Sequence, residues 1–145
     1  MMLPASHANS SRAANHGRQL RIIIADDSRD TVLTLSAILR HEGHDVYGLH
    51  SADEVIRTVR LIRPDVVILD IEMPGMSGYA LAQELRSLYY GSPDAPLLIA
   101  ISGKWVKASD QMLARLVGFA HHLMKPCDPN QLLELIAPLQ KISHP

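Results

Sequence analysis

Carboxylate, hydroxyl and ammonium side chains occur where short apolar segments of this sequence end. Asp26 and Asp27 follow one such segment, Asp70 ends a second, Ser102 a third and Lys125 a fourth. Carboxylates that lie close together raise each other's pKa unless a cation neutralises them. A hard divalent ion with oxygen ligands, above all Mg²⁺, would do so. A serine hydroxyl and a lysine ammonium opposite that ion would then be donors to an anion, as phosphoryl transfer to a carboxylate requires.

Each of these residues also has a simpler interpretation. An aspartate just after a strand is often a helix cap or a turn former. A serine at a strand end usually makes a local backbone hydrogen bond, and a lysine before proline is usually solvated. A functional site is indicated only if these side chains converge at one place. The secondary-structure elements that position them therefore decide between the two interpretations.

Uninterrupted apolar segments alternate with segments of helical periodicity from residue 20 onward. Such continuous apolar runs are typical of parallel strands covered on both faces. Five strand and helix pairs predict an α/β fold with right-handed crossovers and helices on both faces of a parallel sheet. Functional groups of such sheets gather at the carboxyl ends of the strands. The predicted strands are 21–25, 45–50, 66–69, 97–101 and 120–124, and the predicted helix boundaries are marked by Ser51, Glu54, Asp128, Pro129, Gly43, Pro64, Gly91 and Gly118.

Composition limits the class of protein further. The 145 residues are 47% hydrophobic and 20% charged, which suits one domain with one core. Fourteen Lys and Arg against fifteen Asp and Glu give a net charge of -1, so only a local basic patch could attract nucleic acid or a membrane surface. No apolar run reaches the ~20 residues of a membrane span. The single cysteine, Cys127, fits a reducing cytoplasm, and residues 1–19 have the composition of a flexible leader.

The sequence resembles the receiver domain of two-component response regulators. The resemblance covers about residues 20–142, leaves 143–145 as a tail, and implies a flavodoxin-like doubly wound sheet in the strand order 2-1-3-4-5. It rests on the motifs IIIADDSRDTVLTLSAILRHEGHDV (22–46), VVILDIEMPGMSGYAL (66–81), IAISGK (99–104) and HHLMKPCDPNQL (121–132).

The resemblance implies a phosphoacceptor and a metal site. Asp70 would accept the phosphoryl group. Asp27 and Asp70, with the backbone carbonyl of Glu72, would bind Mg²⁺, with Mn²⁺ as an alternative ion, and Asp26 would assist through water. Ser102 would bind the new phosphoryl group and move with it, and Lys125 would pair with its oxygens. The residues that would shape the surrounding loops are Pro74, Gly75, Gly78 and Pro126.

The sequence departs from the family pattern three residues before Lys125. His122 stands there, where the family usually has Tyr or Phe, so we expect a switch residue that can titrate near neutral pH. An exposed or backbone-bonded histidine is the alternative. Glu72 and Lys104 would flank the mouth of the pocket and shield the acyl phosphate from water. Trp105 would contact a partner or cover a helix.

The resemblance implies a signalling switch rather than an enzyme. A sensor histidine kinase or a histidine phosphotransfer protein would phosphorylate Asp70, and the phosphorylated monomer or dimer would bind an output protein or relay the phosphoryl group. Because no output domain follows residue 142, that output protein is expected to be a separate chain. Two alternatives are a receiver-like binding module that never takes phosphate and a haloacid-dehalogenase-type hydrolase, which needs a second aspartate where Ser28 stands.

Overall fold

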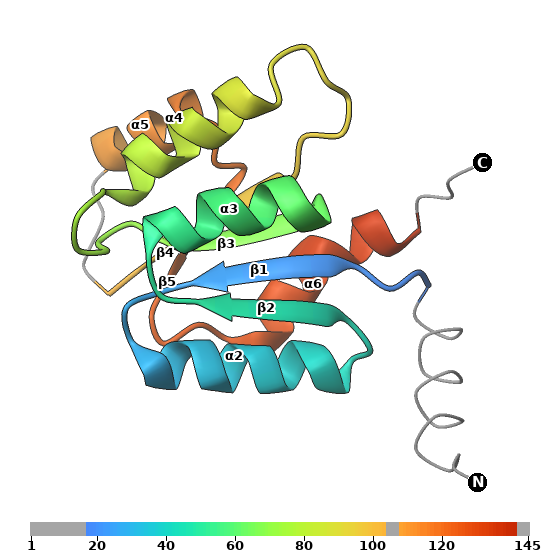
Figure 1. Cartoon of the computed structure of the whole chain (residues 1–145). Helices are drawn as coiled ribbons and strands as arrows, with labels where there is room; N and C mark the ends of the chain where they lie inside the picture. Colours follow the sequence, from blue (N-terminus) through green and yellow to red (C-terminus); the bar gives the residue numbers. More distant parts are fainter. Residues whose placement is uncertain (1–16, 104–107, 142–145) are drawn as a thin grey trace, which may run out of the picture.

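The computed structural model describes residues 17–103 and 108–141, which form a parallel sheet with helices on both faces (Figure 1). The strand order is β2-β1-β3-β4-β5, which confirms the order expected from the resemblance. The strands are β1 (Arg21–Ala25), β2 (Asp45–Leu49), β3 (Val66–Asp70), β4 (Leu97–Ser102) and β5 (His121–Met124). The helices of the described part are α2 (Arg29–His41), α3 (Ala52–Ile62), α4 (Gly78–Leu88), α5 (Ala108–Leu116) and α6 (Pro129–Gln140).

Each strand of the sheet interior contributes to two cores, because successive side chains point to opposite faces. On β1, Ile22 and Ile24 belong to the core under α2 and α6, whereas Ile23 and Ala25 belong to the core under α3, α4 and α5. All four are fully buried. Burying such an isoleucine stabilises the fold by about 1.5–3 kcal/mol. The uninterrupted apolar runs in the sequence are therefore the consequence of a sheet covered on both faces (Figure 1).

Hydroxyl and carboxylate caps begin the helices at the carboxyl edge of the sheet. Ser51 accepts a hydrogen bond from the backbone N–H of Glu54, and Asp128 accepts one from Asn130, as the sequence predicts. Ser77 caps α4 in the same way. Ser28 caps α2, a role that the sequence analysis did not assign. These caps fix where the loops before α2, α3, α4 and α6 end.

Left-handed residues follow α2, α3, α4 and α5 at the opposite edge of the sheet. Gly43, Gly91 and Gly118 have φ values of 95°, 76° and 118°, which glycine adopts without strain. Arg63, at the end of α3, is the non-glycine residue with a positive φ in the described chain, at 50°. The following Pro64 disfavours the right-handed helical conformation for Arg63, so the helix stops there.

The ordered packing starts before Leu20. Arg18, inside the predicted leader, donates from Nε to the carbonyl of Leu139 at 3.1 Å and pairs with Asp65 at 3.1 Å. The remainder of that leader, residues 1–16, and the predicted tail 143–145 lie outside the described residues. Among the helices of the described chain, none has the length and apolarity needed to cross a membrane.

Candidate functional site

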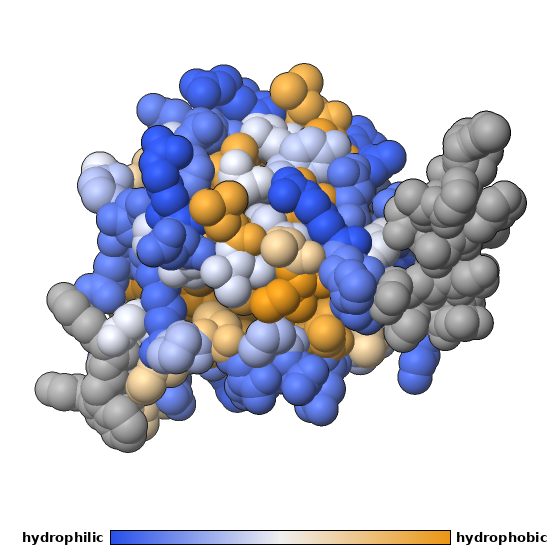
Figure 2. Space-filling view, turned by 90° about the horizontal axis from the view of Figure 1, so that it is seen from below, coloured by the Kyte–Doolittle hydropathy of each residue, from blue (hydrophilic) through white to orange (hydrophobic). Residues whose placement is uncertain are grey.

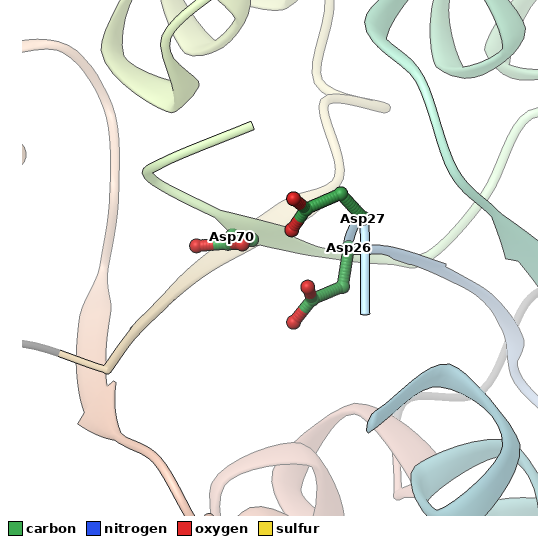
Figure 3. A group of neighbouring side chains, drawn as sticks. All are labelled: Asp26, Asp27 and Asp70. Carbon is green, nitrogen blue, oxygen red and sulfur yellow. The ribbon is translucent and has the colours of Figure 1, made fainter. Parts of the chain in front are cut away.

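Three carboxylates meet at the carboxyl edge of the sheet. Asp26 and Asp27 follow β1, and Asp70 is the last residue of the neighbouring β3. Figure 3 shows their side chains directed toward a common space, and one oxygen from each lies within 4.8 Å of the others. Asp26 is 0% exposed and Asp70 is 3% exposed, whereas Asp27 is at the surface. Strand topology thus brings together the three carboxylates that the sequence analysis singled out.

Asp26 is held by groups from three elements. Its Oδ1 accepts a hydrogen bond of 2.8 Å from the backbone N–H of Ser28 at the start of α2. Its backbone N–H donates to Leu49 of β2, and its carbonyl lies 3.1 Å from Nδ1 of His50. Its Oδ2 forms an ion pair of 2.6 Å with Nζ of Lys125. The buried charge of Asp26 is therefore both positioned and neutralised.

Asp70 lies between one donor and one cation. Its Oδ1 accepts a hydrogen bond of 3.0 Å from the backbone N–H of Glu72, and its Oδ2 lies 3.3 Å from Nζ of Lys125. Burial raises the pKa of Asp70 to about 6, helped by the neighbouring charge of Asp26, while the Glu72 N–H and Lys125 act in the opposite direction. With a pKa of about 6, Asp70 is mostly ionised at pH 7, which is the state in which a carboxylate can act as a nucleophile.

Lys125 is shared by the two buried carboxylates. It follows β5, and its backbone N–H donates to the carbonyl of Ser102 at 2.8 Å. The Lys125–Pro126 peptide bond is cis. Burial alone would lower the pKa of Lys125, but the hydrogen bonds and charges of Asp26 and Asp70 outweigh this effect and raise the pKa. The ammonium group therefore stays charged and is the cation nearest to both carboxylates within residues 17–103 and 108–141.

The donor set fits a hard divalent cation. Three carboxylates face one ammonium group, so the site has an excess of negative charge and oxygen ligands of the kind that Mg²⁺ or Mn²⁺ prefers. Asp27 and Asp70 would hold such an ion, with Asp26 close enough to assist. The backbone carbonyl of Glu72 follows Asp70 by two residues, at the same edge.

The loop after Asp70 is tightly closed. The backbone N–H of Gly78 donates to the carbonyl of Ile71 at 2.8 Å. A Cβ atom at Gly78 would lie 2.6 Å from Cα of Ile71, so any larger residue would push the loop away. Gly75 has a φ of 91°, and Pro74 is exposed at the tip. These contacts hold the Glu72 N–H against Asp70.

Ser102 ends β4 beside this loop. It is 3% exposed, and its hydroxyl donates a long hydrogen bond of 3.5 Å to Oε1 of Glu72. The carboxylate of Glu72 is itself exposed. The structure thus brings Ser102 to the edge that holds Asp70, and Glu72 to the mouth of the pocket. Lys104 and Trp105, for which the sequence predicted roles at the mouth and in partner binding, lie outside the described residues.

His122 is half-buried on β5, along a hollow of about 250 Å³ between α5, β5 and α6. Its Nε2 atom is buried and makes no hydrogen bond within the described part of the chain. Burial lowers the pKa of His122, which favours the neutral imidazole. Arg115 is the charged residue that lines the same hollow.

Two residues of the site lay outside the sequence-based candidates. His50 contacts the carbonyl of Asp26, and Ser28 supplies the N–H that Oδ1 of Asp26 accepts. His50 directly follows β2. The tendency of functional groups to lie at the carboxyl ends of strands could therefore have identified it. Ser28 is a standard N-cap residue two positions after Asp26, so its residue type was an available signal.

The strand order and the acidic edge define a doubly wound, flavodoxin-like α/β domain. The family model described as response regulator receiver domain matches residues 22–137. This chain belongs to the response regulator receiver domain family. That membership decides against the haloacid dehalogenase class.

Individual relatives agree with this assignment. Protein PilH of Pseudomonas aeruginosa is 31% identical over 116 residues, which are 80% of this chain and 93% of PilH. DNA-binding response regulator MtrA of Mycobacterium tuberculosis is 30% identical over 113 residues, but this chain spans 47% of its length. A CheY-like receiver domain protein of Methanospirillum hungatei has a TM-score of 0.74 and 25% identity, covering 84% of this chain and 94% of that one.

A further solved structure shows the fold alone. The receiver domain of Ssk1 from Saccharomyces cerevisiae, crystallised with the histidine phosphotransfer protein Ypd1, is 17% identical. Its TM-score is 0.77, and the match covers 86% of this chain and 90% of that one.

Proposed function

We propose that this chain is a phosphorylatable signalling switch and that Asp70 is its phosphoacceptor. The observation that carries the proposal is the convergence of Asp26, Asp27, Asp70 and Lys125 in a small, largely buried pocket. Asp26 and Asp70 are both buried, and each lies between a backbone donor and Lys125. Asp26 is 0% exposed and pairs with Lys125 at 2.6 Å, whereas Asp70 is 3% exposed and lies 3.3 Å from Lys125, so Asp70 is the more accessible and less tightly paired of the two. This combination suits a carboxylate that must be ionised, oriented and compensated for added negative charge.

The transfer step is a displacement at phosphorus. An oxygen of Asp70 forms a bond to phosphorus while the bond from phosphorus to the imidazole nitrogen of a phosphohistidine breaks, and that nitrogen keeps the electron pair. A bound Mg²⁺ would supply neutralising charge for the phosphoryl oxygens during this step. The Glu72 N–H keeps Asp70 oriented through Oδ1, and Lys125 supplies positive charge beside Oδ2.

Ser102 and Lys125 then respond to the new group. The hydroxyl of Ser102 exchanges its long hydrogen bond to Glu72 for a phosphoryl oxygen, which is a stronger, charge-assisted acceptor. Lys125 moves from the two carboxylates toward the phosphoryl group. The backbone N–H of Lys125 donates a hydrogen bond to the carbonyl of Ser102. Movements of these two residues therefore shift the adjacent strands β4 and β5. His122 lies on β5, so a shift of this strand would also move its buried Nε2, which makes no hydrogen bond within the described part of the chain.

The donor is a sensor histidine kinase or a histidine phosphotransfer protein. The similar receiver domain of Ssk1 binds a histidine phosphotransfer protein in its crystal. Here, α2 begins beside Asp27, and its Leu33 is 66% exposed. Figure 2 shows apolar side chains gathered in the middle of the face on the α2 side, among polar ones. Exposed apolar side chains on the face of α2, the helix that begins two residues after Asp27, would give a helical donor a surface to bind while its histidine approaches Asp70.

Intact-mass measurement with acetyl phosphate and Mg²⁺ tests the proposal. We expect the parent to gain one phosphoryl group, Asp70→Asn to gain none, and a chelator to abolish the gain. Asp53→Asn is the matched control, because Asp53 is an exposed aspartate in the first turn of α3. A parent that never gains phosphate, or an Asp70→Asn variant that still does, would leave a receiver-like binding module as the better interpretation.

A further inference from the structure

Two hollows lie at the amino edge of the sheet, away from the carboxylates. One, of about 300 Å³, lies between α3 and α4, and the other, of about 410 Å³, lies between α4, α5 and the start of β4. Tyr89 lines both, so the hollows adjoin. Residues of the loop from α4 to β4 line both hollows. In Figure 1 this loop lies on the side from which the strand arrows start. The site at Asp70 lies at the arrowheads.

Arginines dominate the charge of these hollows. Arg60 and Arg63 line the first, Arg86 and Arg115 line the second, and Asp94 is the one acidic residue among the lining residues of the two. We call these four arginines the arginine surface. It is a local basic patch on a chain whose net charge is -1.

Most of the guanidinium groups of the arginine surface have no hydrogen-bond or ion-pair partner within the described residues. The side chains of Arg60, Arg63 and Arg115 make no hydrogen bond or ion pair with other residues of the described chain, whereas Arg86 donates to the carbonyl of Leu116 at 2.7 Å. Basic residues in the last turn of a helix complement its dipole, which accounts for their position but not for the hollows between them. Unpaired guanidinium groups are fork-shaped donors that match carboxylates.

Apolar side chains complete the surface. Leu88 beside the first hollow is 41% exposed, and Leu116 beside the second is 67% exposed. The floors are Val59, Leu85 and Leu98, which are almost fully buried. Arginine and aromatic residues around recessed apolar floors are typical of protein interfaces.

We propose that the arginine surface binds an acidic segment of a partner protein, with its apolar side chains in the hollows and its carboxylates on Arg60, Arg63 and Arg115. Recessed apolar floors favour a peptide with side chains to insert over the flat headgroup layer of an anionic membrane. Because the surface and Asp70 lie at opposite ends of the strands, this partner stays bound in both phosphorylation states. The arginine surface therefore keeps the protein bound to this partner, whereas the acidic edge carries the signal that depends on phosphorylation.

Fluorescence anisotropy with the full chain tests the proposal. The probe is a short labelled peptide of Glu, Asp and Leu, and its control replaces every acidic residue by Gln or Asn. We expect the acidic peptide to bind and the neutral one not to. Arg60→Glu should weaken binding roughly tenfold or more, because one charge-assisted hydrogen bond is lost. The matched control is Arg57→Glu, an equal charge change at an exposed position of the same helix that lines neither hollow.

Two additions keep the test independent of folding and of the proposed function. Arg63→Gly removes one arginine at a residue whose φ of 50° suits glycine, so weaker binding cannot be ascribed to a damaged helix end. Asp70→Asn, or beryllofluoride with Mg²⁺, should leave the affinity unchanged. The proposal is overturned if the acidic peptide does not bind, if Arg57→Glu weakens binding as much as Arg60→Glu, if beryllofluoride alters the affinity, or if phosphatidylglycerol vesicles bind in place of the peptide.

Discussion

The two edges of the sheet carry opposite chemistry. At the carboxyl edge, Asp26, Asp27 and Asp70 surround a single lysine. At the amino edge, four arginines surround Tyr89 with one aspartate among them. A net charge of -1 conceals this separation. In a parallel α/β sheet all helices start at one edge and end at the other, so residues that complement the helix dipoles also sort by sign.

The difference also concerns how the charges are compensated. Lys125 pairs with Asp26 and Asp70 inside the protein, whereas the side chains of Arg60, Arg63 and Arg115 have no such partner in the described part of the chain. The carboxyl edge is thus a closed site with its own counter-charge, and the amino edge is an open surface. We propose that the first site holds a small ion and a phosphoryl group and that the second surface binds a larger ligand.

Removal of Lys125 should have the largest effect. Lys125→Met leaves two buried carboxylates without their cation and takes a donor from the phosphoryl group, so we expect roughly 100-fold slower phosphorylation. The free energy of unfolding without Mg²⁺ should fall by about 1–3 kcal/mol. Acetyl phosphate kinetics and urea denaturation measure the two effects. Lys141→Met, at an exposed lysine after α6, is the control, and equal behaviour of the two variants would contradict the closed site.

Asp70→Asn should stabilise the protein when a chelator is present. Burial and Asp26 raise the folded pKa of Asp70 from 3.8 to about 6, so ionisation costs folding free energy as the pH rises from 4 to 6 and the full cost is present above pH 6. We expect a gain of about 1–3 kcal/mol at pH 8 and none at pH 4. Urea denaturation in EDTA measures it. Mg²⁺ should raise the Tm of the parent more than that of the variant, and an equal rise would contradict a metal site that includes Asp70.

Arg63→Gly tests the open edge by itself. A left-handed φ costs a non-glycine residue about 1–2 kcal/mol, which is partly offset by the greater freedom of glycine in the unfolded chain. We expect the free energy of unfolding to stay unchanged or to rise by up to about 1 kcal/mol, because no bond of the Arg63 side chain within the described residues is lost. A clear decrease in thermal denaturation experiments would show that Arg63 stabilises the fold.

The smallest effect concerns His122, on the strand that leads to Lys125. Because burial lowers its folded pKa, the folded state increasingly opposes protonation as the pH falls below the ordinary histidine value of about 6.5. The parent should therefore lose more stability than His122→Phe between pH 8 and pH 5. Urea denaturation across this range measures the difference. Parallel curves would mean that His122 has the same pKa in the folded and unfolded states.

Sequence patterns predicted the fold and the carboxylates for a common physical reason. Burial on both faces forces continuous apolar strands, and parallel strands place the residues after them at one edge, so Asp26, Asp27 and Asp70 could be found by counting strand ends. The arginine surface could not be found this way. Arg60, Arg86 and Arg115 come from three helices, and their neighbourhood depends on how those helices pack.

Side-chain partners were also beyond the sequence. The resemblance assigned Lys125 to phosphoryl oxygens, and in the structure its Nζ lies 2.6 Å from Asp26 and 3.3 Å from Asp70. His122 could be recognised as unusual, but its unbonded Nε2 depends on the packing of α5 and α6 around β5. Strand position is encoded locally, whereas these contacts depend on the whole fold.

The bridge formed by Lys125 would make metal binding an exchange reaction. A divalent ion entering the pocket would meet two carboxylates that already have a counter-ion, and it would compete with the ammonium group for them. The affinity measured for the ion is then the difference between two cations' interactions with the same carboxylates. Shortening or neutralising that side chain would thus tighten ion binding even while it slows phosphorylation, so occupancy of the metal and readiness to react are separate properties of this pocket.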